Sequence, residues 1–495
     1  MTFRRLGTIL ALTAGLGAAS TAAADPVKLK SYNAAIGDSS ISGVSSGAFM
    51  AVQFGTAWSS DIQGVGIVAG GPYWCDLADS SDVLTAYTRP IGRALGPCMQ
   101  GPASDLDTND FIRKAAANAT ASVIDPLDNL KRQRIYLFHG TNDTKVYKAS
   151  TDATAAFYRH YLGEAGRANL FYQTALGAGH SLVVQQQGQA DLAACNANRN
   201  PFIDQCGYDQ AGIILQHIYG RLRQPNRGQL KGTVQRFDQA AYTGADIPDA
   251  LSMSDAGYVF VPQDCDDGAA CRVHIALHGC AQDTDHVGRR FVDETGYNAW
   301  ADTNHLIVLY PQVKASTVEP VNPLACWDWW SYVNHTDDYV TKNGAQIRAI
   351  KAMLDALTAG AKGNNQADDK TVPGTTGDAS LAAPAATSDV SATAPSLSVI
   401  DTSDGGADLA FDPAPDRAIY RVFRAGADGT FTVIGETTSP SFADTDLTPQ
   451  TIYRWHVVIV LNGSEGPPSA DVTATTRATP PACDKPGTCP VDAVR

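Results

Sequence analysis

The chain has 495 residues, 44% of them hydrophobic and 18% charged, which is enough for two to four ordinary globular domains. Its formal net charge is −14 and no basic run compensates for it, which argues against nucleic acid and anionic membranes as partners.

Residues 1–24 have the pattern of a secretory signal peptide. Arg4 and Arg5 precede a short apolar run, Leu6 to Leu16, and Ala22-Ala23-Ala24 offers an A-x-A cleavage site. A membrane anchor is the alternative, but the run is short and rich in Ala and Gly, and no other segment reaches ~18 apolar residues. We therefore expect an exported protein, extracellular or periplasmic, with no stable membrane insertion.

The segment Gly43-Val44-Ser45-Ser46-Gly47 fits the G-x-S-x-G elbow, in which a nucleophilic serine occupies a tight turn between a strand and a helix. Such a turn favours glycine because a Cβ would clash with neighbouring groups. A chance turn is the alternative in a chain with 44 glycines, and the elbow lies unusually near the N-terminus. We predict that Ser45 is a nucleophile.

Residues 25–360 alternate strand-like apolar runs with helical stretches, which is typical of an α/β domain. One helical face collects Ile347, Ile350, Met353, Leu354 and Leu357. The predicted strands are Val65 to Ala69, Arg134 to Phe138, Asn169 to Thr174, Val273 to Leu277 and Leu306 to Tyr310.

A nucleophilic serine needs a base that takes its proton and an acid that orients the base. Asp143 comes directly after the predicted strand 134–138, and His180 lies in a small-residue loop after the next strand. An Asx-turn or helix cap is the alternative for Asp143, and a plain surface histidine for His180. The chain order Ser45, Asp143, His180 is that of an α/β-hydrolase triad, which favours these three residues together.

The oxyanion of an acyl transfer is usually held by backbone N–H groups, one of them from the residue after the nucleophile. That residue is Ser46. The second should come from a His-Gly loop at a strand end, and His278-Gly279-Cys280 follows the predicted strand 273–277. We predict the amides of Ser46 and Cys280 as the oxyanion hole.

Ten cysteines in an exported chain indicate disulfides, and no CxxC or clustered Cys/His spacing supports the alternative of a zinc site. Neither a metal nor an organic cofactor is expected. Pairing neighbours along the chain gives Cys75–Cys98, Cys195–Cys206, Cys265–Cys271, Cys280–Cys326 and Cys483–Cys489.

The predicted elements follow one another along the chain in an unusual order for a hydrolase. After His180 come the predicted strand before the oxyanion loop, the strand Leu306 to Tyr310 and the helix near Leu357. Joining residue 360 back to residue 30 restores the usual hydrolase order. We therefore predict a circularly permuted α/β-hydrolase over residues 25–360, a rearrangement that is tolerated when the old termini lie close together on the surface.

Composition then changes to a linker of small and polar residues, 361–395. Residues 396–477 resume short alternating strands and resemble a fibronectin type III domain, with Tyr453 as the tyrosine of its corner. A tail, 478–495, carries Cys483 and Cys489.

Four segments stand out together: Ser42 to Met50, Leu277 to Gln282, Tyr297 to Asn304 and Cys326 to Trp330. They resemble the polyhydroxybutyrate depolymerases of the form with the serine motif near the N-terminus. The resemblance covers about residues 30–360 and implies the same triad and oxyanion hole, with a polyester or its oligomers as the partner.

The resemblance also implies that an aromatic residue of the last segment contacts the polyester, and we predict Trp330. For Trp327 and Trp329 we expect burial, because an extended segment would place them on the face opposite to Trp330. Extracellular family members typically carry a further substrate-binding domain after the fibronectin-like spacer, where this chain stops. Action on amorphous polymer, on soluble oligomers or in a periplasm is therefore expected, rather than adhesion to crystalline granules.

Our hypothesis is a secreted serine esterase that cleaves poly(3-hydroxybutyrate) to 3-hydroxybutyrate oligomers or monomer. An esterase of another polymer, of the feruloyl or acetylxylan type, would share the triad and differ in the groove. A non-catalytic surface-binding protein on a hydrolase scaffold is the third hypothesis, and the fibronectin-like domain is compatible with it.

Overall fold

The computed structural model describes residues 27–76, 92–185 and 192–361, and within the C-terminal region 394–395, 397–402, 405–411, 418–426, 428–437, 441–445, 447–461 and 464–478. The predicted signal peptide, most of the predicted linker, and the tail with Cys483 and Cys489 lie outside the described residues.

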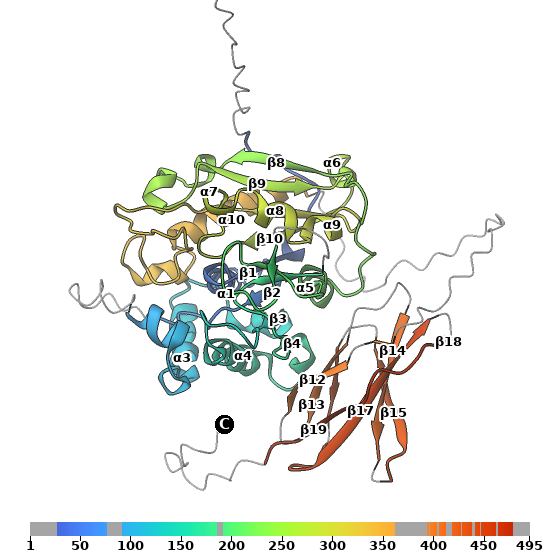
Figure 1. Cartoon of the computed structure of the whole chain (residues 1–495). Coiled ribbons are helices and arrows are strands. Elements are labelled where there is room, and N and C mark those ends of the chain that lie inside the picture. Colours follow the sequence, from blue (N-terminus) through green and yellow to red (C-terminus); the bar gives the residue numbers. More distant parts are fainter. Residues whose placement is uncertain are drawn as a thin grey trace, which may run out of the picture.

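An eight-stranded sheet forms the centre of residues 27–361, in the order β4-β3-β2-β1-β10-β11-β9-β8 (Figure 1). The six strands from β4 to β11 are parallel, whereas β9 and β8 are antiparallel to their neighbours. The strands are β1 (Ser39–Val44), β2 (Ile62–Val68), β3 (Arg134–Phe138), β4 (Leu170–Gln173), β8 (Thr233–Asp238), β9 (Ala256–Val261), β10 (Arg272–Leu277) and β11 (Leu306–Tyr310).

This sheet is that of an α/β-hydrolase whose chain begins in the middle of the fold. Counting from β8, the strands lie in the order 1-2-4-3-5-6-7-8, in which strand 3 leads to the oxyanion loop and strand 5 to the elbow. The two points that the permutation joins are neighbours, because the amide of Tyr32 donates to the carbonyl of Leu357 at 2.8 Å. The structure therefore confirms a circularly permuted α/β-hydrolase fold.

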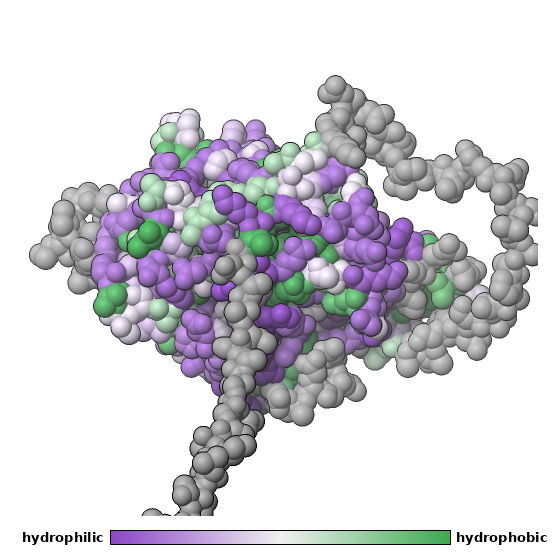
Figure 2. All heavy atoms as spheres, turned by 90° about the horizontal axis from the view of Figure 1, so that it is seen from above, coloured by the Kyte–Doolittle hydropathy of each residue, from purple (hydrophilic) through white to green (hydrophobic). Residues whose placement is uncertain are grey.

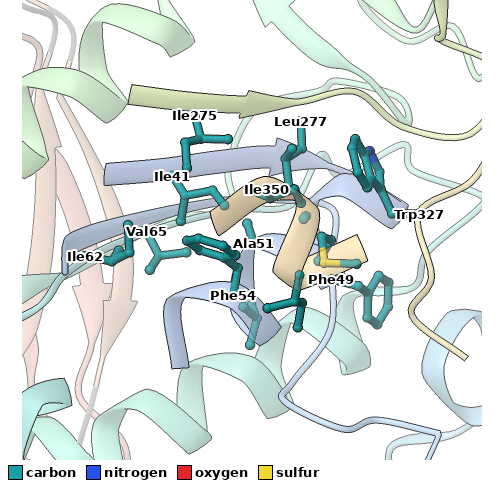
Figure 3. Packing of buried hydrophobic residues seen from close by; sticks show 14 of the residues in the cluster. Ile41, Phe49, Ala51, Phe54, Ile62, Val65, Ile275, Leu277, Trp327 and Ile350 are labelled. Atoms are coloured by element: carbon teal, nitrogen blue, oxygen red, sulfur yellow. The ribbon is translucent and has the colours of Figure 1, made fainter. Parts of the chain in front are cut away.

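Helices cover both faces of the sheet, as a largely parallel sheet requires. On one face α1 and α10 meet the apolar side chains of β1, β2 and β10, among them Ile41, Val65 and Ile275 (Figure 3). On the other face α5 and α9 pack over a second cluster. The helices are α1 (Ser46–Ala57), α3 (Thr108–Thr120), α4 (Lys148–Leu162), α5 (Gln210–Tyr219), α6 (Gln263–Asp266), α7 (Thr284–Val287), α8 (Arg290–Glu294), α9 (Tyr297–Ala301) and α10 (Ala345–Thr358).

Helix α1 is the most enclosed of the described helices, because every one of its residues is buried. Its composition of small and apolar residues allows this, and a helix that is apolar all round belongs in a core. The helix that begins at the elbow is therefore held from all sides, which fixes the position of the turn before it.

The C-terminal region folds as two antiparallel sheets with their own core around Trp455. Tyr453 accepts a hydrogen bond from the amide of Thr448 at 2.9 Å, the contact that defines a tyrosine corner. These features identify a fibronectin type III-like sandwich. Its strands are β12 (Leu397–Thr402), β13 (Ala407–Phe411), β14 (Ala418–Ala425), β15 (Phe431–Thr437), β16 (Ser441–Asp444), β17 (Ile452–Leu461), β18 (Ser464–Glu465) and β19 (Val472–Thr475).

Four disulfides occur in the described part of the chain, and they join the cysteines that are neighbours in sequence: Cys75–Cys98, Cys195–Cys206, Cys265–Cys271 and Cys280–Cys326. None of the described helices is long and apolar enough to cross a bilayer. The face seen in Figure 2 is mostly hydrophilic, with hydrophobic residues in separate small groups.

Candidate active site

The three predicted catalytic residues follow parallel strands of the same sheet. Ser45 comes directly after β1, Asp143 follows β3 by five residues, and His180 follows β4 by seven. Because the carboxyl ends of parallel strands meet at one edge of the sheet, the three loops gather at that edge. This is the edge at which open α/β sheets bind their ligands.

The turn at Ser45 is sharp and strained, with φ 55° and ψ −124°. Glycine is needed on both sides of it, because a Cβ on Gly43 would lie 2.2 Å from the carbonyl oxygen of Gly47. A Cβ on Gly47 would lie 2.4 Å from the carbonyl oxygen of His278. Ser45 remains partly exposed while its neighbours are buried, so the turn presents this side chain at the edge of the sheet.

Both carboxylate oxygens of Asp143 accept hydrogen bonds. One oxygen accepts from the amides of Lys145 and Val146 at 2.8 and 3.0 Å, and the other is 2.8 Å from Nδ1 of His180. The side chain of Asp143 has no exposed area and that of His180 is 6% exposed. The imidazole is thus held through Nδ1, which leaves Nε2 to face a substrate or the serine.

Burial by itself would raise the pKa of Asp143, but the charge of His180 and the hydrogen bonds from His180, Lys145 and Val146 outweigh it. The pKa of Asp143 is therefore lowered from its ordinary value. The carboxylate stays ionised at neutral pH and favours the tautomer of His180 that carries its proton on Nδ1.

No hydrogen bond joins the Ser45 hydroxyl to His180 among the described residues, so the structure pairs Asp143 with His180 and leaves the hydroxyl of Ser45 unpaired with them. Nucleophile–base hydrogen bonds are often long in ligand-free sites and tighten when substrate binds.

The loop that carries His180 is anchored to the loop of Asp143 through Asn198. The side-chain oxygen of Asn198 accepts from the amides of Thr144 and His180 at 3.0 and 2.9 Å, and its nitrogen donates to the carbonyl of Asn142. The disulfide Cys195–Cys206 closes the segment that contains Asn198. The contacts of Asn198 and the disulfide therefore hold Asp143 and His180 together in addition to their own hydrogen bond.

The amide of Ser46 belongs to the elbow, and Cys280 lies in the loop that follows β10. Strand β1 pairs with β10, with Gly43 opposite Leu277, so the turn and the oxyanion loop leave the sheet together. A Cβ on Gly279 would lie 3.1 Å from Cβ of Ser45. Neither amide donates to an acceptor within the described residues, which leaves both free for a ligand oxygen.

The predicted oxyanion loop, His278-Gly279-Cys280, is also linked to the segment that follows β11. The disulfide Cys280–Cys326 joins the two, the amide of Ala281 donates to the carbonyl of Leu324, and the indole of Trp327 donates to the carbonyl of His278 at 3.0 Å. A link across 46 residues stabilises the fold by roughly 3–4 kcal/mol in the chain-entropy model.

Trp330 is the least buried aromatic residue of its segment. Trp327, Trp329 and Tyr332 are 0–3% exposed, whereas Trp330 is only partly buried and packs on Trp329 and Tyr332. Residues 326–332 form bends and turns instead of an extended run, so simple alternation does not explain this difference. The indole N–H of Trp327 donates a hydrogen bond, so this side chain can be buried without leaving a polar group unpaired.

One cavity lies outside the predicted site. It has a volume of about 610 Å³ and is lined by residues of α8, α9 and the 225–230 segment, and none of the predicted site residues lines it. No cluster of three or more His, Cys, Asp or Glu side chains in the described part of the chain could hold a metal ion.

Two residues that hold these loops together, Asn198 and Gln282, have no recognisable signal in the sequence. Asn198 and Gln282 each bind backbone groups of two segments that are distant in sequence, and a polar residue with that use has no local pattern. The two antiparallel strands β8 and β9 were also missed, although Ala256–Val261 is an apolar run of the kind that predicts a strand.

The sheet order and the elbow after β1 together define an α/β-hydrolase of the serine type. No family model matches the chain. The chain is 35% identical over 435 residues to a poly(3-hydroxybutyrate) depolymerase of Delftia acidovorans, covering 87% of this chain and 77% of that protein. It is also 35% identical over 365 residues to a polyhydroxybutyrate depolymerase of Talaromyces funiculosus, covering 72% of this chain and 98% of that protein. The chain therefore belongs to the polyhydroxybutyrate depolymerase family.

Solved structures agree with this assignment. A PHB depolymerase complexed with an R3HB trimer is similar with a TM-score of 0.58 and 31% identity, covering 68% of this chain and all of that chain. The PHB depolymerase from Penicillium funiculosum gives a TM-score of 0.57 and 32% identity over the same shares of the two chains.

A buried acid next to the His180 loop generates a prediction about pH. Asp204 lies in the short strand β7 (Ile203–Gln205), is 0% exposed, and has no hydrogen-bond partner for either carboxylate oxygen among the described residues. Burial raises the pKa of Asp204 to about 7, against the opposing effects of Ser181 and Arg199. The folded protein therefore holds a proton on Asp204 that the unfolded chain releases near pH ~4.

Because this pKa is raised in the folded state, the stability contribution of Asp204 is present at low pH and is lost as the pH rises from ~4 through 7. We expect Asp204→Asn to melt at a higher temperature than the wild type at pH 8, with a smaller difference at pH 5. The exposed Asp255→Asn is the matched control and should show no such trend. Thermal melts that give the same difference at both pH values would contradict the prediction.

Proposed function

We propose that this protein is an exported esterase that hydrolyses poly(3-hydroxybutyrate) to oligomers or monomer through an acyl-enzyme on Ser45. The observation that carries the proposal is the hydrogen bond of Asp143 to His180 at the same sheet edge as the strained Ser45 elbow. The relatives that share two thirds or more of their length with this chain are named as depolymerases of this polymer.

In this mechanism Oγ of Ser45 attacks the ester carbonyl carbon while Nε2 of His180 takes the hydroxyl proton. Asp143 accepts the Nδ1–H of His180 and stabilises the imidazolium that forms. The tetrahedral intermediate then collapses, and Nε2 returns the proton to the leaving alcohol oxygen. A water molecule repeats the sequence on the acyl-enzyme, which releases a 3-hydroxybutyrate acid end and restores Ser45.

The negative oxygen of each tetrahedral intermediate would be held by the amides of Ser46 and Cys280. Both N–H groups lack acceptors within the described residues, and Gly279, the residue before Cys280, lies against the Ser45 turn. A single oxyanion donor is worth about 10²–10³ in kcat, so the loops that aim these amides would contribute substantially to the rate.

For the substrate, we propose that Trp330 provides an apolar contact for the polyester. It is partly buried and braced by Trp329 and Tyr332, and the loop that precedes it is tied by a disulfide to the proposed oxyanion donor Cys280. A rigid aromatic surface suits a polymer whose repeat carries methyl groups and no charge. Export is supported by the four disulfides, which persist in oxidising compartments.

Replacing the nucleophile tests the proposal. Ser45→Ala should reduce clearing of a poly(3-hydroxybutyrate) suspension by about 10⁴-fold or more, because no other group can form the acyl-enzyme. A fluorophosphonate should label the wild type and fail to label the variant, whereas Ser104→Ala, at an exposed serine, should behave as the wild type. Retained clearing by Ser45→Ala, or faster cleavage of feruloyl or acetyl esters than of the polyester by the wild type, would sink the assignment.

Replacing Trp330 separates polymer contact from chemistry. Trp330→Ala should slow hydrolysis of the polymer suspension roughly 5–10-fold, the cost of losing one good aromatic contact, while kcat/KM on a soluble ester changes less than about twofold. Trp330→Phe should keep most of the polymer activity. Equal losses on the two substrates would show that Trp330 acts on the site itself and not on polymer binding.

A further inference from the structure

Gln282 is completely enclosed, with 1% of its surface exposed, and all of its side-chain polar atoms are used. Its Oε1 accepts from the amide of Gly279 at 2.7 Å. Its Nε2 donates to the carbonyls of Pro201 and Phe202, both at 2.9 Å. One side chain thus joins the oxyanion loop to a segment that lies 80 residues earlier in the chain.

The carbonyl of Gly279 is also bound, by the backbone of Gln282 and the side chain of His278. The amide of Gln282 donates to the carbonyl oxygen of Gly279 at 3.3 Å, and Nδ1 of His278 lies 2.7 Å from the same oxygen. Nε2 of His278 accepts from the amide of Val313, so the proton of this buried imidazole is on Nδ1 and is donated to Gly279. Both backbone polar groups of Gly279 are therefore fixed.

Fixing the carbonyl of Gly279 also fixes the amide of Cys280, because the two belong to one planar trans peptide and point in opposite directions. With the carbonyl turned toward His278 and Gln282, the N–H of Cys280 must point to the other side. That N–H has no acceptor among the described residues, and Gly279 lies against the Ser45 turn. Rotation of this one peptide would remove an oxyanion donor without moving the triad.

The far end of the link reaches the base. Phe202 has a positive φ of 56°, its ring lies edge-on to that of His180 with centroids 5.9 Å apart, and its carbonyl also accepts from the amide of Leu182. Gln282 therefore holds the oxyanion loop at a fixed distance from the segment that packs on His180.

We propose that Gln282 is a positioning residue that aims the Cys280 amide at the reacting carbonyl and couples the oxyanion loop to the His180 loop. This inference rests on the proposed function. It assigns the residue no contact with substrate: Gln282 acts through the peptide between Gly279 and Cys280. Removing its polar end leaves the amide of Gly279 and the carbonyl of Pro201 without partners, and leaves the carbonyl of Phe202 with only the amide of Leu182, so the loop would reorganise to satisfy them.

The test compares a soluble 3-hydroxybutyrate ester with its thiono analogue, in which sulfur replaces the carbonyl oxygen. Sulfur accepts hydrogen bonds poorly, so an oxyanion hole accelerates the oxygen ester far more than the thiono ester. We expect Gln282→Leu to lower kcat on the oxygen ester by about 10–10²-fold. The ratio of oxygen-ester to thiono-ester rates should fall by about tenfold, with little change in KM.

Gln133→Leu is the matched control, because Gln133 is also 0% exposed and donates to two backbone carbonyls, but it lies at the opposite end of α1 from the elbow. It should lose stability and keep the wild-type ratio. Gln282→Glu keeps an acceptor for Gly279, should show an intermediate ratio, and carries the test if the leucine variant does not fold.

An unchanged ratio, within about twofold, in the Gln282 variants that fold would overturn the inference, even if kcat fell, since the residue would then be merely structural. A Ser45→Ala protein that still cleaves the oxygen ester would instead overturn the proposed function. The two failures are therefore distinguishable in one set of assays.

Discussion

The structure depends on one close contact, in which the turn between β1 and α1 is pressed against the end of β10. Gly47 permits it, because a Cβ there would lie 2.4 Å from the carbonyl oxygen of His278. Gly43 lets the turn itself close, because a Cβ there would lie 2.2 Å from the carbonyl oxygen of Gly47. The contact puts the Ser45 hydroxyl, the Ser46 amide and the oxyanion loop within one small volume. Helix α1 is buried along its whole length and cannot retreat, so the strain at Ser45 is retained in the fold.

Loops carry the rest of the site, and they are made rigid by side chains that bind backbone. Asp143 accepts from two amides of its own loop, and Asn198 joins that loop to the loop of His180. Gln282 joins the segment of Pro201 and Phe202 to the loop that follows β10. Disulfides close the segments on either side, at Cys195–Cys206 and Cys280–Cys326. A site built on loops gains from such cross-links the precision that strands would otherwise provide.

The sequence indicated the architecture well because its signals were local. The elbow, the strand before Asp143 and the His-Gly-Cys segment each have a pattern within ten residues, and their order along the chain predicted the permutation that the contact of Tyr32 with Leu357 completes. The network around Asn198 and Gln282 could not be predicted, because it depends on segments tens of residues apart. Tertiary packing also determines that Trp330 is less buried than Trp327 and Trp329, since residues 326–332 bend where alternation assumed an extended chain.

In the proposed reaction an ester passes through a covalent intermediate on Ser45, within reach of His180 and the amides of Ser46 and Cys280. The most direct measurement is peptide mass mapping after the protein is mixed with a soluble 3-hydroxybutyrate trimer and quenched in acid within the first turnover. A transient hydroxybutyryl ester is expected on the peptide that contains Ser45, and it should be absent from Ser45→Ala. Turnover with the acyl group on another residue, or with none on Ser45 at any quench time, would contradict it.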